Sequence, residues 1–228
     1  MISIIICSRK KDINYNLSEN IQDTVGCDYE LIVIDNSQNR YSIFEAYNLG
    51  IKKSKGDFLC FMHDDIAIHS QDWGNIIYRI FKENNEIGLI GIAGSKVKTK
   101  MPSAWWNCPN DQKVIYIIQH FKGKVGEEEK WDLGFKRGSN LEEVVALDGV
   151  FMAMRKENGI CFNNVMKGFH NYDLNISFEF TKLGYKIIVT NEILIEHFSN
   201  GSMNKEWVES TFQIHEIFLI FQVHTLYP

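Results

Sequence analysis

The chain has 228 residues, of which 45% are hydrophobic and 23% charged, and its formal net charge is -5. This length can bury one sizeable core, and the apolar content argues against intrinsic disorder. The acidic balance also argues against sequence-independent nucleic-acid binding, which needs an excess of Lys and Arg on one face.

The cysteines and the N-terminus indicate a cytoplasmic protein. The five cysteines are scattered and never spaced as C-x-x-C, so no disulfide framework or zinc knuckle is predicted. The apolar segment Ile2–Cys7 has no basic residues before it and is followed at once by charged residues, which is wrong for a signal peptide. No stretch approaches the ~20 apolar residues of a membrane-spanning helix.

Short apolar runs alternate with helical patterns through the first half of the chain. The predicted strands are Ile2–Cys7, Glu30–Ile34, Phe58–Met62 and Ile87–Ala93. A helix over Ser42–Ser54 is predicted to open with a capping box. This alternation is typical of βαβ units, so we expect an α/β fold with one Rossmann-like mixed sheet, mostly parallel, flanked by helices.

The second half is expected to form a smaller β region and two helices. The predicted strands are Val114–Gln119, Val144–Leu147, Phe151–Met154, Lys186–Val189 and Ile193–Glu196. The polar stretch Lys122–Asn140, with its Glu127–Glu129 charge run, is predicted to be a solvated loop. A helix over Tyr172–Leu183 should end at Gly184. Residues 204–228 are predicted to form a C-terminal helix that packs on the 1–203 domain or on a second copy in a homodimer.

Polar residues follow the first three predicted strands, where ligands bind in open α/β sheets. They are Ser8 and Arg9, then Asp35 and Asn36, then His63, Asp64 and Asp65. A carboxylate after the second strand can accept hydrogen bonds from a base or ribose, and Ser8 and Arg9 can reach a phosphate. Turn formation is the alternative for each of these residues.

The His63-Asp64-Asp65 triplet is the sharpest of these groups. In an extended segment residues 63 and 65 point the same way, so an imidazole and a carboxylate would converge on manganese or magnesium. A solvated turn is the alternative. Among the other histidines, His69, His120, His170, His215 and His224 show no paired spacing for a metal site, and no chemistry is assigned to them.

The run from Ala46 to Asp65 resembles the nucleotide-sugar core of the family 2 glycosyltransferases with the GT-A fold. In that family an A-x-N-x-G helix, a glycine and a strand lead into a D-x-D-type metal motif. The segments Ile4–Arg9 and Val33–Ser37 resemble its first two nucleotide-contacting strand ends. His63 stands where this motif has its first Asp. The resulting H-x-D triplet resembles that of a subgroup of the family with a streptomycin-biosynthesis-like glycosyltransferase domain. One carboxylate fewer lowers the affinity expected for a hard cation.

The resemblance also assigns roles farther along the chain. Asp173 takes the position of the general base, although Tyr172 stands where Glu is common, and His197 resembles a late His that completes the metal or diphosphate site. Asp148 and Gly149 resemble an acceptor-side D-G pair. A helix cap and a loop residue are the alternatives for Asp173 and His197. A position at a helix N-terminus would hold the pKa of Asp173 down.

The adjacent indoles of Trp105 and Trp106 could stack on the apolar face of an acceptor sugar, and core packing is the alternative. The resemblance implies an inverting transfer of a sugar from a UDP- or dTDP-linked donor to a hydroxyl of a saccharide or small molecule, with a divalent cation. A nucleotide-binding protein without catalysis is the first alternative. A nucleotidyltransferase is a weaker one, because Ser8–Asp12 contains no glycine for a phosphate loop.

Overall fold

The computed structural model describes the chain except residues 122–127, 158, 200, 202 and 223–228. Its larger sheet has seven strands in the spatial order β2-β1-β3-β11-β5-β12-β9. They are β2 (Tyr29–Asp35), β1 (Ile2–Ser8), β3 (Phe58–Met62), β11 (Phe151–Arg155), β5 (Ile87–Gly91), β12 (Lys186–Thr190) and β9 (Leu141–Val144). Strands β3 and β5 are buried along their whole length, which explains their uninterrupted apolar sequences.

The sheet is mixed, as predicted, but its parallel pairings do not outnumber its antiparallel ones. Strand β1 pairs parallel with both β2 and β3, and β12 pairs parallel with β5. Strand β11, however, lies antiparallel between β3 and β5, and β9 is antiparallel to β12. The mixed character arises because strands from the second half of the chain insert between and beside those of the first.

A second sheet covers the region where the site is built. Its path is β10 (Ala146–Leu147), β6 (Ala93–Ser95), β7 (Lys113–His120), β13 (Ile195–His197) and β4 (Ile66–Ile68), with β8 (Glu128–Leu133) paired to β7. The predicted strand Ile87–Ala93 is thus split, since the chain leaves the first sheet after β5 and enters the second at β6.

Part of the predicted loop Lys122–Asn140 is a strand. Residues 128–133 form β8, which pairs antiparallel with β7 from Ile115 to His120, while residues 122–127 lie outside the described residues. Its sequence, EEKWDL, lacks regular alternation and is mostly exposed. Cross-strand pairing with β7 therefore outweighs a weak local preference, as is common for edge strands.

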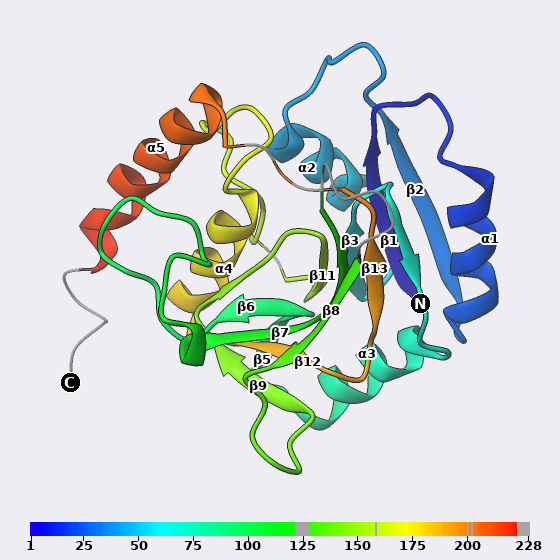
Figure 1. Cartoon of the computed structure of the whole chain (residues 1–228). Helices are drawn as coiled ribbons and strands as arrows, with labels where there is room; N and C mark the ends of the chain where they lie inside the picture. Colours follow the sequence, from blue (N-terminus) through cyan, green and yellow to red (C-terminus); the bar gives the residue numbers. More distant parts are fainter. Residues whose placement is uncertain (122–127, 158, 200, 202, 223–228) are drawn as a thin grey trace.

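The helices are α1 (Tyr15–Thr24), α2 (Ile43–Lys53), α3 (Trp73–Glu83), α4 (Tyr172–Lys182) and α5 (Lys205–Gln222), with a short 3-10 turn at Asn110–Gln112. The capping box of α2 is confirmed, because Ser42 and Glu45 bond reciprocally to each other's backbone N–H. Gly184, at φ +79°, follows the end of α4. Figure 1 shows α4 and α5 side by side at one end of the molecule, with α1 at the other.

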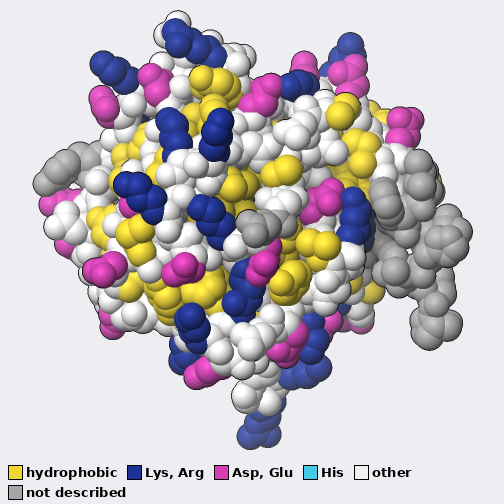
Figure 2. All heavy atoms as spheres, turned by 180° about the vertical axis from the view of Figure 1, so that it is seen from behind, with side chains coloured by type: hydrophobic (Ala, Val, Ile, Leu, Met, Phe, Trp, Pro, Cys, Tyr) yellow, Lys and Arg dark blue, Asp and Glu magenta, His cyan; other side chains and the backbone are white. Residues whose placement is uncertain are grey.

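No helix among the described residues is both long enough and apolar enough to cross a membrane. On the face shown in Figure 2, Lys and Arg side chains are interspersed with Asp and Glu and with apolar side chains. This mixture is typical of a solvated surface.

Candidate active site

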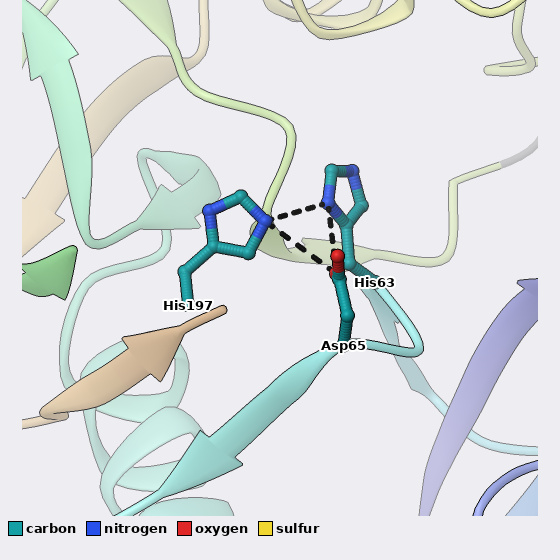
Figure 3. A group of neighbouring side chains, drawn as sticks. All are labelled: His63, Asp65 and His197. Atoms are coloured by element: carbon teal, nitrogen blue, oxygen red, sulfur yellow. Dashed lines mark hydrogen bonds and ion pairs between the residues drawn. The ribbon is translucent and has the colours of Figure 1, made fainter. Parts of the chain in front are cut away.

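Three side chains from distant parts of the chain converge above the junction of the two sheets. His63 and Asp65 lie between β3 and β4, and His197 is the last residue of β13. His63 Nδ1 lies 3.4 Å from His197 Nε2, and Asp65 Oδ1 lies 3.5 Å from His197 Nε2 and 3.8 Å from His63 Nδ1. Figure 3 shows both rings and the carboxylate pointing toward one another. We call this group the His63–Asp65–His197 triad.

Each imidazole of the triad is held by a second partner through its other nitrogen. His63 Nε2 lies 2.6 Å from the Tyr172 hydroxyl, and His197 Nδ1 lies 3.1 Å from Gln119 Oε1. The amide nitrogen of Gln119 donates to the carbonyl oxygens of His120 and Ser199, so its oxygen must face His197. His197 is therefore held by Gln119 through Nδ1 and faces the triad with Nε2.

The electrostatics of the triad favour a charged Asp65 carboxylate beside an uncharged His63 ring. Burial alone would raise the pKa of Asp65, but hydrogen bonds from His197 and Ser199 outweigh burial and hold the pKa below its ordinary value. Burial, followed by the proximity of His197, lowers the pKa of His63. An ionised Asp65 and an unprotonated His63 are the forms that bind a metal ion.

The triad fits a divalent cation. Donor atoms that share one ion at about 2.1 Å stand roughly 3 to 3.5 Å apart, close to the separations observed here. Two imidazole nitrogens and one carboxylate oxygen suit manganese or zinc better than magnesium. These three residues could therefore hold the cation, with Tyr172 and Gln119 fixing the two rings from outside.

Asp64, between the two donors, faces another way. Its Oδ2 accepts a hydrogen bond of 2.7 Å from Ser8 Oγ at the end of β1, and Ser8 is fully buried. This bond connects the carboxyl ends of the neighbouring strands β1 and β3. Ser8 and Asp64 thus lie at the carboxyl ends of β1 and β3, where the sequence predicted a nucleotide.

The other residues predicted to contact a nucleotide differ in their exposure to solvent. Arg9 and Asp35 are exposed, and Asp35 Oδ1 also accepts a hydrogen bond from the backbone N–H of Ser37. Asn36 is buried, and its side chain bonds to the backbone carbonyl and N–H of Tyr41. The amide of Asn36 therefore stabilises the loop from Asn36 to Tyr41. Arg9 and Asp35 are the exposed groups that can contact a ligand.

Asp173 lies in the first turn of α4, and the helix cap is Asn171. Its Oδ1 accepts a hydrogen bond of 2.8 Å from the backbone N–H of Leu174, and the N–H of Gly149 also bonds to the carboxylate. Burial and the nearby Asp148 nevertheless raise the pKa of Asp173 to about 7. The expectation that the helix N-terminus would hold this pKa down is wrong, because burial beside a second carboxylate outweighs the backbone hydrogen bonds.

The predicted acceptor-side residues lie together but play different parts. Trp105 is buried, and its Nε1 donates to Asp148 Oδ2 at 3.0 Å. Trp106 meets Trp105 edge-on and is 37% exposed. A Cβ on Gly149 would lie 2.3 Å from the Tyr172 hydroxyl, so the glycine makes room for that ring. Trp106 is therefore the indole available for stacking, while Trp105 holds Asp148.

Sequence reasoning assigned no role to Gln119 and noted Tyr172 only as a departure from a motif. Each acts by contacting a histidine far away in the sequence, at separations of 78 and 109 residues. The signal that could have suggested Tyr172 is the joint occurrence of His63 and Tyr172 at two positions where carboxylates are expected.

Comparisons with known proteins give the family. A family model described as "Glycosyltransferase like family" matches residues 3–218, and the chain therefore belongs to this family. No curated protein matches the sequence. Membership places the chain among glycosyltransferases and does not separate the streptomycin-biosynthesis-like subgroup from the rest.

Solved structures give the fold. The crystal structure of GalNAc-T7 with UDP, GalNAc and Mn2+ is similar with a TM-score of 0.63 and 10% identity, covering 95% of this chain and 47% of that chain. The chain thus spans about half the length of this structure. The crystal structure of A197 from STIV matches with a TM-score of 0.45 and 13% identity over 87% of this chain and 86% of that chain. The similarity to the GalNAc-T7 structure shows the GT-A fold expected from the sequence.

Proposed function

We propose that the chain transfers a sugar, with inversion, from a UDP- or dTDP-linked donor to a hydroxyl of a saccharide or small-molecule acceptor. The observation that carries this proposal is the His63–Asp65–His197 triad, a set of cation donors built at the carboxyl edge of a GT-A sheet in a member of a glycosyltransferase family. The solved structure with UDP, GalNAc and Mn2+ supports a nucleotide diphosphate and a divalent cation for this chain as well.

The donor would lie along the edge formed by β1, β2 and β3. Arg9, exposed after β1, would face phosphate oxygens, and Asp35, exposed at the end of β2, would accept hydrogen bonds from the ribose or base. Asp64 is held by Ser8 and borders the same edge. A cation on the triad, for which manganese suits the donors better than magnesium, would supply positive charge to the departing diphosphate.

Asp173 supplies the base in this proposal. The acceptor hydroxyl gives its proton to the Asp173 carboxylate while its oxygen bonds to the anomeric carbon, and the bond from that carbon to the diphosphate breaks. A pKa of about 7 makes Asp173 a stronger base than an ordinary carboxylate and still leaves much of it ionised at neutral pH. Trp106, partly exposed beside Trp105, would stack on the acceptor.

The test is the release of nucleoside diphosphate from a panel of UDP- and dTDP-sugars, with and without manganese and with and without candidate acceptors. We expect release that needs both an acceptor and the cation and that is lost in Asp65→Asn. Nucleotide binding without release for any donor and acceptor would instead support the inactive nucleotide-binding alternative.

A further inference from the structure

A second group of metal-ligating side chains lies outside the proposed active site. His120 ends β7, Glu128 begins β8 and Glu196 lies in the middle of β13, while His69 follows β4. Although far apart in the sequence, these residues meet on the second sheet. The pairing of β7 with β8 places His120 opposite Glu128, and the pairing of β13 with β7 places Glu196 beside Ile118.

The group is centred on Glu196, whose two oxygens each contact a histidine. His120 Nε2 lies 2.7 Å from Glu196 Oε1, and His69 Nε2 lies 2.8 Å from Glu196 Oε2. Glu128 Oε2 approaches the same His120 nitrogen at 3.7 Å. The donor atoms of His120, Glu128 and Glu196 all lie within 4.8 Å of one another, which is close enough to share one ion.

This group is separate from the His63–Asp65–His197 triad. Glu196 and His197 are consecutive residues of β13, so their side chains leave opposite faces of the strand. His197 points to the triad, and Glu196 points to His69 and His120. One short strand thus contributes a donor to each group.

The charge balance of the second group favours a cation. Glu196 is only 18% exposed, and it and Glu128 both approach Nε2 of His120, so two carboxylates face the same imidazole. A divalent cation would neutralise both carboxylates and use the lone pair of His120 Nε2.

We propose that His120 Nε2, Glu196 Oε1 and Glu128 Oε2 bind a zinc ion, with water completing the coordination. One imidazole and two carboxylates form a borderline donor set that suits zinc, which takes nitrogen and oxygen ligands together. His69 holds the other oxygen of Glu196 from outside, as groups around metal ligands commonly do. The ion would join β7, β8 and β13, and this inference does not depend on the proposed sugar transfer.

The test measures zinc binding after the triad has been disabled. In the background His63→Gln/Asp65→Asn, two of the three donors of the triad are lost, so a remaining site can be counted alone. We expect the chelator-treated protein to bind one equivalent of zinc in a competition assay with a chromophoric chelator. Zinc should also raise its melting temperature, because the ion binds the folded chain.

Neighbouring glutamates on β8 provide the matched variants. Glu128→Gln removes a ligand at an exposed position where folding is safe, and Glu129→Gln changes the next residue, on the other face of the strand. We expect at least about tenfold weaker zinc binding in Glu128→Gln and unchanged binding in Glu129→Gln. Absence of zinc binding in the His63→Gln/Asp65→Asn background, or equal effects of the two substitutions, would overturn the proposal and leave a hydrogen-bonded network.

Discussion

At the residue scale, Asp173 shows how the site changes an ordinary group. Its backbone hydrogen bonds and its place in the first turn of α4 both favour the ionised carboxylate. Burial and the nearby Asp148 favour the protonated carboxyl more strongly, so the pKa of Asp173 rises to about 7. Two neighbouring carboxylates in a partly buried site are typical of sites of general acid–base catalysis.

Asp173→Asn should abolish sugar transfer and raise stability at neutral pH. Loss of a general base typically costs ~10²- to 10⁴-fold in rate. In the wild type the folded chain keeps the Asp173 proton up to about pH 7, while the unfolded chain loses it near 3.8, so stability falls with pH between these values. The variant lacks this loss, which is at most ~4 kcal/mol.

Rate and melting temperature should be measured on the same Asp173→Asn preparation between pH 4 and 8. The stability gain should grow toward pH 7 and then remain constant. Near-normal turnover together with a lower melting temperature would instead assign Asp173 a purely structural role in α4.

The wild-type rate should increase with pH through about 7. Only the ionised Asp173 can accept the acceptor's proton, and its pKa lies at that value. The measurement is kcat against pH at saturating donor, acceptor and manganese. A flat profile from pH 5 to 8 would contradict a base with this pKa.

Tyr172→Phe should weaken the binding of manganese while leaving the fold intact. The hydroxyl of Tyr172 contacts His63 Nε2 at 2.6 Å and orients the ring, while the aromatic ring itself packs on Tyr47. Loss of such an outer partner typically costs ~10- to 100-fold in metal affinity. Manganese titration followed by electron paramagnetic resonance measures this change, and nucleotide binding without metal is the control that should not move.

The sequence predicted the donors of the triad better than the groups that orient them. His63 and Asp65 are two residues apart and follow a recognisable strand, so local spacing and the family resemblance place them. Tyr172 and Gln119 depend on how α4 and β7 pack against the loop after β3, and no local pattern encodes that packing. The second histidine group, around Glu196, was missed for the same reason.

At the element scale, α5 is attached to the rest of the chain through α4. The ring of Phe218 packs against Phe178 with 4.8 Å between centroids, and Ile214 is also buried. Asn171 Nδ2, at the start of α4, donates to the hydroxyls of Ser210 and Thr211. Helix α5 therefore holds the end of α4 that carries Tyr172 and Asp173.

Ile214→Ala should lower the free energy of unfolding by about 2 to 4 kcal/mol, because it leaves a cavity between α5 and α4. The matched control is Phe212→Ala on the same helix, since Phe212 is 54% exposed and its loss should change stability by less than ~0.5 kcal/mol. Urea unfolding compares the two variants. Similar effects would show that α5 does not contribute to the core through Ile214.

Elements whose ends are marked by local sequence signals were predicted well. Strands that depend mainly on a partner far away in the sequence were not. The capping box of α2 and the glycine after α4 are readable because they satisfy backbone groups within a few residues. Strand β8 exists through its partner β7, and the break between β5 and β6 exists because the chain changes sheets. Neither leaves a periodic pattern in its own residues.

At the scale of the whole molecule, the antiparallel insertion of β11 joins the two halves of the chain. It places the Asp148-Gly149 segment next to the end of β3, where the N–H of His63 bonds to the carbonyl oxygen of Val150. The two donors from the first half thus meet α4 and β13 from the second half. Sequence patterns predicted the α/β class but not this order of strands, because insertion depends on contacts made across the whole chain.

Nucleotide and cation should strengthen each other's binding to the folded chain. If the diphosphate contacts a cation held by the triad, manganese must strengthen UDP or dTDP binding, and the nucleotide must strengthen manganese binding by the same factor. We expect a factor in the range of ~5 to 150, measured by calorimetric titration in both orders. A factor of 1 in both orders would contradict this prediction and show that the nucleotide and the cation bind independently.

Two neighbouring aspartates separate the contributions of cation and nucleotide. Asp65 belongs to the triad, whereas Asp64 bonds to Ser8 on the nucleotide edge. Asp65→Asn should abolish the coupling and leave nucleotide affinity without manganese unchanged. Asp64→Asn should weaken nucleotide binding in the presence and absence of manganese and preserve the coupling factor. Equal behaviour of the two variants would contradict the division of the His63-Asp64-Asp65 triplet into two cation donors and one nucleotide-side residue, because that division requires their side chains to act on different ligands.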